Sequence, residues 1–366
     1  MPERYLTLPV SPDAEAFLRC LKRQGTPQRV HVFELMIDPE VQNALCDRFR
    51  LLDGLDSADP YYTEKRTIRL QRFLGYDYVR QGIERLEMPF HRQSVADTAA
   101  LGRTDGRSFV DESRGPITTW EEFERYPWPD PHAASARALE WYQENLPDDM
   151  CIVGSGGFGH FAEHLIWLMG YQTLCYALYD KRDLVRAIAD RLLEINEVLS
   201  RRMLEYPRVW LTLSADDMGF KTGTLVKPDD LREFVLPGHR RMAEMAHAAG
   251  RLYALHSCGQ LRAIMPDLIE DVGIDAKHSF EDTIEDIRDA KQTYGERIAV
   301  LGGVDMDFLY RADEQALRAR VREVVDACQP GGGFCLGSGN SIANYIPLEN
   351  YLIMLDEGRR LARTVA

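Results

Sequence analysis

A histidine and a cysteine, two residues apart, offer the clearest metal chemistry in the sequence. His256 and Cys258 follow the apolar run 252–255, which predicts a short buried strand that ends at them. Residues two apart on a strand point to the same face, so both side chains can reach one ion. A second thiol, Cys335, stands in another strand-like run. Either residue type alone is more often part of the core, but one imidazole with two thiolates and an open fourth position is typical of catalytic zinc.

Further polar residues stand where predicted strands end. Asp216 and Asp217 follow the strand-like run 209–213, so one of them faces the end of the strand in either register. They are interpreted either as a helix cap or turn pair, or as a substrate contact, a general acid or base, or an extra oxygen ligand to the metal. Other residues after strand ends are predicted to line a substrate pocket: Lys277, His278, Asp305, Ser338 and Asn340.

The elements that must position these residues alternate between strand and helix. About eight strands are predicted, the first at 29–33 and the last carrying Cys335, and most are separated by amphipathic helices. This order favours a parallel sheet closed into a (β/α)8 TIM-type barrel. In that fold the carboxyl ends of all strands meet on one rim, where active sites lie. We expect a single domain over 1–366, with an N-terminal helical extension at 1–28 and an irregular insertion at 87–130.

Composition narrows the function classes. The chain has 366 residues and a net charge of −14, from 44 basic and 58 acidic residues, which argues against a nucleic-acid partner. There is no run of about 18 apolar residues, so no membrane span is expected. Seven scattered cysteines fit free thiols in a reducing compartment, and we expect a cytoplasmic protein.

Two other motifs have competing interpretations. The run 154–159 is a literal G-x-G-x-x-G after a strand, typical of dinucleotide binding, but the following residues are helical with no second strand to bind the ribose. A tight loop at the barrel rim is favoured instead. The run 160–164 matches the H-x-x-E-H pattern of certain zinc proteases, but also fits the polar face of a helix in a barrel.

Several segments together resemble one known family. The chain is similar to the uroporphyrinogen decarboxylase superfamily, and more closely to its zinc- and corrinoid-dependent methyltransferase branch, from about Ile152 to the C-terminus. The segments that carry the resemblance are 213–223, 255–259, 301–305, 336–340 and 346–350. The resemblance implies a distorted (β/α)8 barrel, zinc held through H-x-C and a distant cysteine, and a homodimer.

The resemblance has two departures. The family often places the third zinc ligand in a Gly-Cys-Gly turn, and the corresponding turn here reads Gly337-Ser338-Gly339, with Cys335 three residues earlier. Either Cys335 supplies the third thiolate from the strand, or the metal is held differently. True decarboxylases carry an Arg-Gln-Ala-Gly-Arg segment after the first strand. The equivalent region, 32–39, has no arginine and contains acidic residues, so a polyanionic porphyrinogen would be repelled.

The expected function is zinc-dependent transfer of a methyl group between a corrinoid (cobalamin) protein and a thiol or a methoxy- or methylamine-type small molecule. Zinc would hold a thiol as thiolate at neutral pH, or act as a Lewis acid on a departing oxygen. The sequence lacks a D-x-H-x-x-G corrinoid motif, so the corrinoid is expected on a separate partner protein. A decarboxylase, and a non-catalytic barrel that binds a tetrapyrrole or a metal, are the alternatives.

Overall fold

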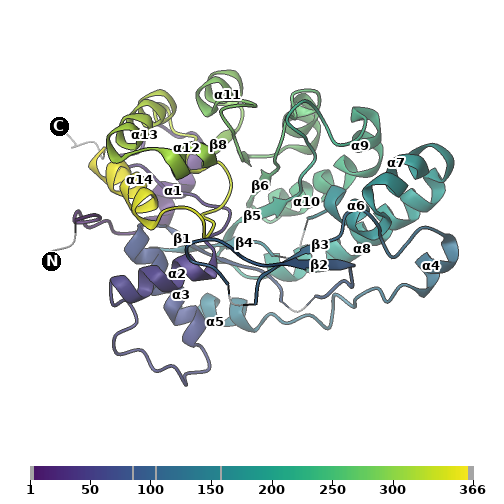
Figure 1. Cartoon of the computed structure of the whole chain (residues 1–366), viewed down its shortest axis with the longest axis horizontal. Helices are drawn as coiled ribbons and strands as arrows, with labels where there is room; N and C mark the ends of the chain where they lie inside the picture. The colour runs from purple at the N-terminus through teal and green to yellow at the C-terminus, as the bar shows by residue number, and fades with distance from the viewer. Residues whose placement is uncertain (1–3, 85, 104, 157–158, 362–366) are drawn as a thin grey trace.

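A curved parallel sheet forms the centre of the structure, a computed structural model that describes residues 4–84, 86–103, 105–156 and 159–361. Within these residues the sheet has seven strands in the order β1-β4-β5-β6-β7-β8-β9, all pairs parallel. The helices lie around the outside of the strands (Figure 1). The strands are β1 Tyr78–Gln81, β4 Cys151–Gly154, β5 Val209–Ala215, β6 Leu252–His256, β7 Ala276–His278, β8 Ala299–Val304 and β9 Phe334–Ser338.

Residues 31–33 lie beside β9 and add to the edge of the sheet. Val32 bridges Leu336 in parallel, and the backbone bonds Phe33 N to Leu336 O and Leu336 N to His31 O are both 2.8 Å. The predicted first strand is therefore present as a short bridge. On the side away from β9, this segment contacts β1 through a side chain. The Tyr78 hydroxyl accepts a hydrogen bond from the Glu34 backbone amide at 3.2 Å. The predicted TIM-type fold is confirmed.

Helices alternate with the strands along the chain. The described residues between β4 and β5 form α6, α7 and α8 and contain no strand, as the sequence predicted for the segment after the glycine-rich loop. Residues 157 and 158 of that loop lie outside the described residues. The helices are α1 Ala14–Leu21, α2 Pro39–Arg48, α3 Tyr62–Leu74, α4 Trp120–Arg125, α5 Arg137–Asn145, α6 Ala162–Met169, α7 Tyr171–Asp180, α8 Arg182–Leu204, α9 Pro228–Phe234, α10 Leu236–Ala248, the π-helix η1 Asp267–Val272, α11 Ile287–Tyr294, α12 Met306–Arg311, α13 Glu314–Cys328 and α14 Leu348–Arg360.

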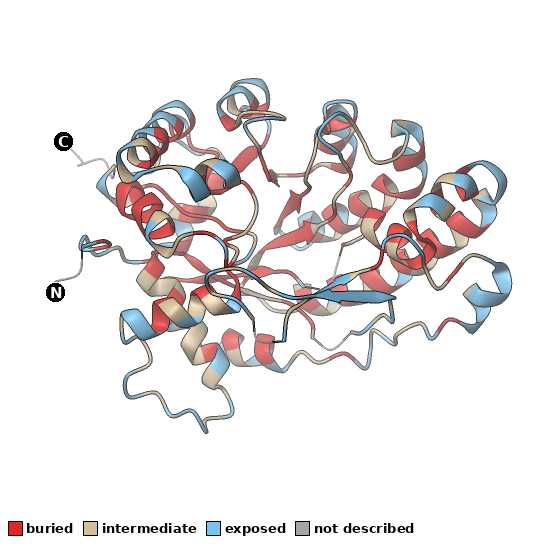
Figure 2. Cartoon of the chain, viewed as in Figure 1, coloured by how far each residue is buried: buried red, intermediate tan, exposed pale blue. Residues whose placement is uncertain are grey.

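The sheet is buried on both faces, as parallel sheets require. Every residue of β4, β6, β8 and β9 is buried, and Figure 2 shows the strands red beneath partly exposed helices. Helix α1 lies at the amino-terminal end of the sheet, where the Phe17 ring packs 5.5 Å from that of Tyr78 and Gly333 N donates to Cys20 O. None of the helices in the described ranges is long and apolar enough to cross a membrane.

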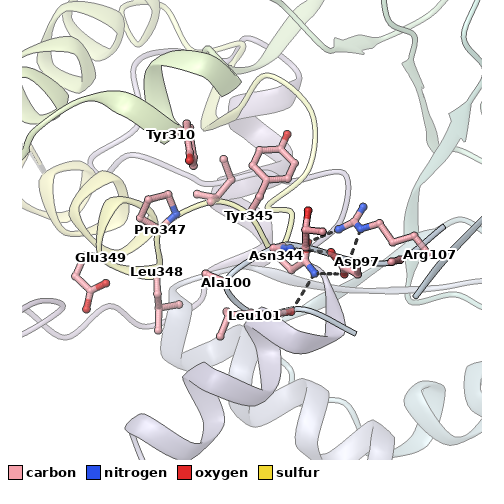
Figure 3. Close-up of a pocket in the computed structure, with 14 residues that line it drawn as sticks. Asp97, Ala100, Leu101, Arg107, Tyr310, Asn344, Tyr345, Pro347, Leu348 and Glu349 are labelled. Atoms are coloured by element: carbon pink, nitrogen blue, oxygen red, sulfur yellow. Dashed lines mark hydrogen bonds and ion pairs between the residues drawn. The ribbon is translucent and has the colours of Figure 1, made fainter. Parts of the chain in front are cut away.

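The residues predicted as an insertion, 87–130, contain an antiparallel hairpin of β2 Arg92–Val95 and β3 Arg107–Val110, together with α4. Polar contacts hold the hairpin to the loop after β9. Asn344 Nδ2 donates to Asp97 Oδ2 at 2.7 Å, and Arg107 donates to Asn344 Oδ1 (Figure 3). Arg107 also pairs with Asp38 at 3.0 Å. A cavity of about 880 Å³ lies beside these contacts, with Tyr310 and Tyr345 on its other side.

Candidate metal centre

Three side chains from two neighbouring strand ends meet at the carboxyl end of the sheet. His256 ends β6, Cys258 follows it, and Asp217 stands two residues beyond β5, whose Ala215 is in register with His256. His256 Nε2 lies 3.5 Å from Cys258 Sγ and 3.6 Å from Asp217 Oδ1. One ligand atom from each residue lies within 4.8 Å of the others. A hydrogen bond of 2.8 Å from Cys258 N to Asp217 Oδ1 fixes the two loops together.

The spacing of these atoms fits zinc. With Zn–S of about 2.3 Å and Zn–N and Zn–O of about 2.1 Å, tetrahedral coordination places N and S about 3.6 Å apart and N and O about 3.4 Å apart. Both values agree with the distances from His256 Nε2. The Asp217 side chain is 41% exposed, whereas that of His256 is 4% exposed, so the group opens toward solvent on the aspartate side. Three ligands with an open side match a catalytic zinc site better than a closed structural one.

His278 sets the proton arrangement of His256. The Nδ1 atoms of the two rings are 2.7 Å apart, and both rings are buried. If His256 offers the Nε2 lone pair to a metal, its Nδ1 carries hydrogen and donates to His278 Nδ1. The Nε2 of His278 then carries hydrogen; it makes no hydrogen bond of normal geometry among the described residues, although the Ser338 carbonyl faces this ring and raises its pKa. Burial outweighs that effect and lowers the His278 pKa to about 3, so the ring is neutral.

Hydrogen-bond donors surround the Cys258 sulfur. Asn340 Nδ2 lies 3.2 Å and Ser279 Oγ 3.6 Å from Sγ. Ser279 has a φ of +83°, a strained value for a residue other than glycine. Burial, followed by the charge of Asp217, raises the Cys258 pKa to about 12, so the thiol keeps its proton without a cation. A zinc ion would deprotonate it, and both donors would then stabilise the thiolate.

The structure differs from the sequence prediction at Cys335, which does not join this group. Cys335 is fully buried and stands three residues before the end of β9, which corresponds to about 10 Å along a strand. Its thiol lies beside that of Cys20 on α1, whose Sγ donates to the Phe334 carbonyl at 3.2 Å at the amino-terminal end of the sheet. Asp217 is the third member of the candidate group. An extra oxygen ligand to the metal was one of the roles that the sequence analysis considered for it, beside a substrate contact and a general acid or base.

The adjacent aspartates have different environments. Asp216 is fully buried, and its carboxylate accepts hydrogen bonds from the backbone amides of Phe161, Ala162 and Glu163 at 2.9–3.0 Å. It also contacts His239 Nε2 at 2.8 Å. These bonds satisfy the free amides at the start of α6. Asp216 therefore has the capping role that the sequence analysis weighed against catalysis, and only Asp217 joins the candidate centre.

Three predicted pocket residues make internal contacts instead. Lys277 donates to the Ser279 carbonyl at 2.6 Å and thereby holds the strained residue beside Cys258, while burial lowers the Lys277 pKa to about 8. Asp305 caps α12 through the Asp307 amide at 2.9 Å. The Ser338 hydroxyl is fully buried and donates to Glu34 Oε2 at 2.6 Å. His278 and Asn340, by contrast, lie directly against the candidate ligands.

The acidic residues used to argue against a decarboxylase are both engaged. Glu34 accepts from the Ser338 amide and hydroxyl, and burial raises its pKa to about 8, so it is largely protonated at neutral pH. Asp38 pairs with Arg103 and Arg107. The repulsion inferred from the sequence is thus weaker than two free carboxylates would give.

Glu34 should make stability fall with rising pH. A carboxyl whose pKa rises from an ordinary 4.5 to about 8 keeps its proton in the fold after the unfolded chain has ionised. The contribution of Glu34 to the free energy of unfolding is fully present below pH 4.5. It decreases between pH 4.5 and about pH 8, by at most about 1.4 kcal/mol per pH unit. We expect Glu34→Gln to flatten this slope, measured as the free energy of unfolding in urea at several pH values between 5 and 8. Equal slopes in both proteins would contradict the assignment.

A histidine–glutamate pair from the H-x-x-E-H motif lies within electrostatic reach of Asp217. His160 Nδ1 is 2.7 Å from Glu163 Oε2. Against the effect of burial, this contact and the nearby acidic charges, Asp217 among them, raise the His160 pKa. Burial raises the Glu163 pKa to about 7. His164 instead is buried, with its ring 5.4 Å from that of Trp167. The protease interpretation needs both histidines on one metal, and they are absent from the candidate metal group found in the described residues.

Sequence reasoning missed Ser279, Glu34 and Arg80. The signal available for Arg80 was the period of two on the second strand, which the sequence predicts at 76–79 and which ends two residues later in the structure, at Gln81. Ser279 and Glu34 offered no comparable signal, because each directly follows a strand at a position where side-chain direction depends on the turn.

Comparisons with known proteins agree with this architecture. The family model described as "Uroporphyrinogen decarboxylase (URO-D)" matches residues 112–361. A methylated-thiol–coenzyme M methyltransferase of Methanosarcina mazei is 31% identical over 130 residues, which cover 35% of this chain and 32% of the relative. The match thus spans about a third of that relative's length.

Two solved structures share the fold to different degrees. A methyltransferase from Methanosarcina mazei superposes with a TM-score of 0.64 at 18% identity, covering 98% of this chain and 99% of that one. A putative vitamin-B12-independent methionine synthase from Listeria monocytogenes gives a TM-score of 0.45 at 14% identity, covering 92% and 97%, which is too distant to support an argument. Because the family model matches more than half of the sequence, the chain belongs to the uroporphyrinogen decarboxylase (URO-D) family.

Proposed function

We propose that this protein is a zinc-dependent methyltransferase that moves a methyl group between a corrinoid protein and a small molecule, with a thiol as the preferred acceptor. The observation that carries the proposal is the open group of His256, Cys258 and Asp217, whose atom spacing fits tetrahedral zinc. The similarity to a methylated-thiol–coenzyme M methyltransferase supports the same chemistry. Methoxy- and methylamine-type donors remain predictions from the sequence.

Each residue of the centre has a separate task in this proposal. His256, Cys258 and Asp217 would hold the zinc, which supplies the positive charge that lowers the pKa of a coordinating thiol. His278 orients His256, while Asn340 and Ser279 donate to the Cys258 sulfur. These contacts keep the ligands in place before substrate arrives, which reduces the reorganisation that binding requires.

The corrinoid is proposed to arrive on a partner protein that covers the carboxyl end of the sheet. Large apolar side chains are half exposed on loops that follow strand ends: Met36, Phe220 and Tyr345. Exposed apolar groups around a site are typical of surfaces that bind another protein. Homodimer assembly and a cytoplasmic location remain predictions.

The test is methyl transfer itself. Zinc-loaded protein would be incubated with methylcobalamin and 2-mercaptoethanesulfonate, and release of reduced cobalamin followed by absorbance. In this reaction the Co–C bond breaks, the S–C bond forms, cobalt keeps the electron pair and the thiol proton passes to solvent. We expect turnover that is lost in Asp217→Ala. Turnover of uroporphyrinogen, or no transfer to any thiol from free or protein-bound methylcobalamin, would overturn the proposal.

A further inference from the structure

Arg80 stands inside the carboxyl end of the barrel. It follows Tyr78 by two residues on β1 and therefore shares its face. The Tyr78 ring lies 5.3 Å from that of Phe33, which in turn lies 5.6 Å from the His278 ring in the interior. Arg80 lies two residues nearer than Tyr78 to the carboxyl end of β1. This face is the interior of the barrel, where the His278 ring lies against that of His256 in the candidate metal centre.

The guanidinium of Arg80 has no acidic partner among the residues that the structure describes. Within the described ranges its hydrogen bond runs from Nε to Ser155 Oγ at 3.1 Å, and no described residue accepts from its two terminal nitrogens. Burial acts to lower the Arg80 pKa, yet an arginine stays charged in proteins. By contrast, Arg103 and Arg107 at the same end of the barrel both pair with Asp38. A partly buried charge without a counter-ion is costly, and an incoming anion would offset that cost.

The backbone brings Ser155 to this arginine. A side chain at Gly82 would place its Cβ 1.7 Å from the Ser155 carbonyl, so the loops after β1 and β4 approach more closely than any other residue type allows. Ser155 is 6% exposed, and its hydroxyl accepts from Arg80, which leaves the hydroxyl hydrogen available to a ligand. Two terminal nitrogens and one hydroxyl thus offer donors to oxygen atoms of a planar or tetrahedral anion.

We infer that Arg80 and Ser155 bind an acidic group, a carboxylate or sulfonate, on the small-molecule substrate. This inference rests on the proposed function in one respect: the other end of the same molecule would carry the thiol to His256, Cys258 and Asp217. The acidic group would orient the substrate. A neutral thiol would bind less tightly, because it would leave the Arg80 guanidinium buried without a partner.

The test separates the anion site from the metal site. Ethanesulfonate and propanoate carry the acidic group but no thiol, and their binding to the protein would be measured by calorimetry with and without zinc. We expect both to bind wild type in either state, and Arg80→Gln to weaken them by at least about 10-fold. Arg80→Lys should retain part of the binding, and Ser155→Ala should weaken it less. Arg19→Gln, which removes an exposed arginine on α1, is the matched control and should bind like wild type.

The thiol pair 2-mercaptoethanesulfonate and 2-mercaptoethanol gives a second readout on zinc-loaded protein. Arg80→Gln should lose affinity for the first and keep its affinity for the second, with unchanged zinc content. Equal binding of ethanesulfonate by wild type and a folded Arg80→Gln, or no binding by wild type, would overturn the inference. If Arg80→Gln does not fold, the comparison of Arg80→Lys and Ser155→Ala decides it. Anion binding without any zinc-dependent methyl transfer would instead overturn the proposed function alone.

Discussion

Cys258→Ala is expected to abolish zinc binding at neutral pH. The wild-type chain should hold about one zinc ion, and removal of the sole thiolate should weaken its affinity by at least about 100-fold, more than loss of an outer contact costs. The Cys258 Sγ is 3.5 Å from His256 Nε2 and is approached by Asn340 and Ser279, and no other described cysteine belongs to the group. Metal content after dialysis, measured by mass spectrometry, and competition with a chelator would quantify the loss.

Cys335→Ala is the matched control, because it removes a thiol from the same barrel at the opposite end of a strand. Cys335 lies beside Cys20, so its replacement should keep zinc and cost about 1 kcal/mol of stability for a small buried cavity. Zinc loss in Cys335→Ala but not in Cys258→Ala would contradict the site described here. Loss in both variants with intact folding would restore the ligand set predicted from the sequence.

The direction of side chains along a strand was predictable, and so was the pairing of His256 with Cys258. The period of two places residues of one strand on one face, and this rule needs no knowledge of neighbouring strands. Parallel strands also bring their carboxyl ends together, which is why Asp217, just after β5, was expected near His256, at the end of β6. The register of Ala215 with His256 then completes the group.

Depth along the barrel was not predictable in the same way. Strands in a barrel are staggered, so residues near the ends of two strands need not lie at the same height. Cys335 is three residues from the end of β9, and this offset is sufficient to place it beside α1 rather than at the mouth. Arg80 was missed for the opposite reason, since the second strand ends two residues later than predicted.

Asp216→Ala should destabilise the fold far more than Asp217→Ala, although the two residues are adjacent. The Asp216 carboxylate accepts three backbone amides at the start of α6 and contacts the buried His239. The other ring nitrogen of His239, Nδ1, is hydrogen-bonded to the Tyr253 hydroxyl at 2.8 Å, and this hydroxyl donates to Ser214 Oγ. Removal of the carboxylate leaves these buried donors unsatisfied, with an expected loss of about 3–5 kcal/mol in the free energy of unfolding, measured in urea.

Asp217→Ala provides the matched comparison because the same chemical change is made one residue away. The Asp217 side chain is 41% exposed and accepts one backbone hydrogen bond, from Cys258, so its loss should cost no more than about 1 kcal/mol. Zinc affinity should nevertheless fall, since a candidate ligand is removed, while Asp216→Ala should keep zinc in whatever fraction stays folded. The reverse pattern, with Asp216→Ala stable but metal-free and Asp217→Ala unstable but zinc-bound, would exchange the two roles and move the metal centre toward α6.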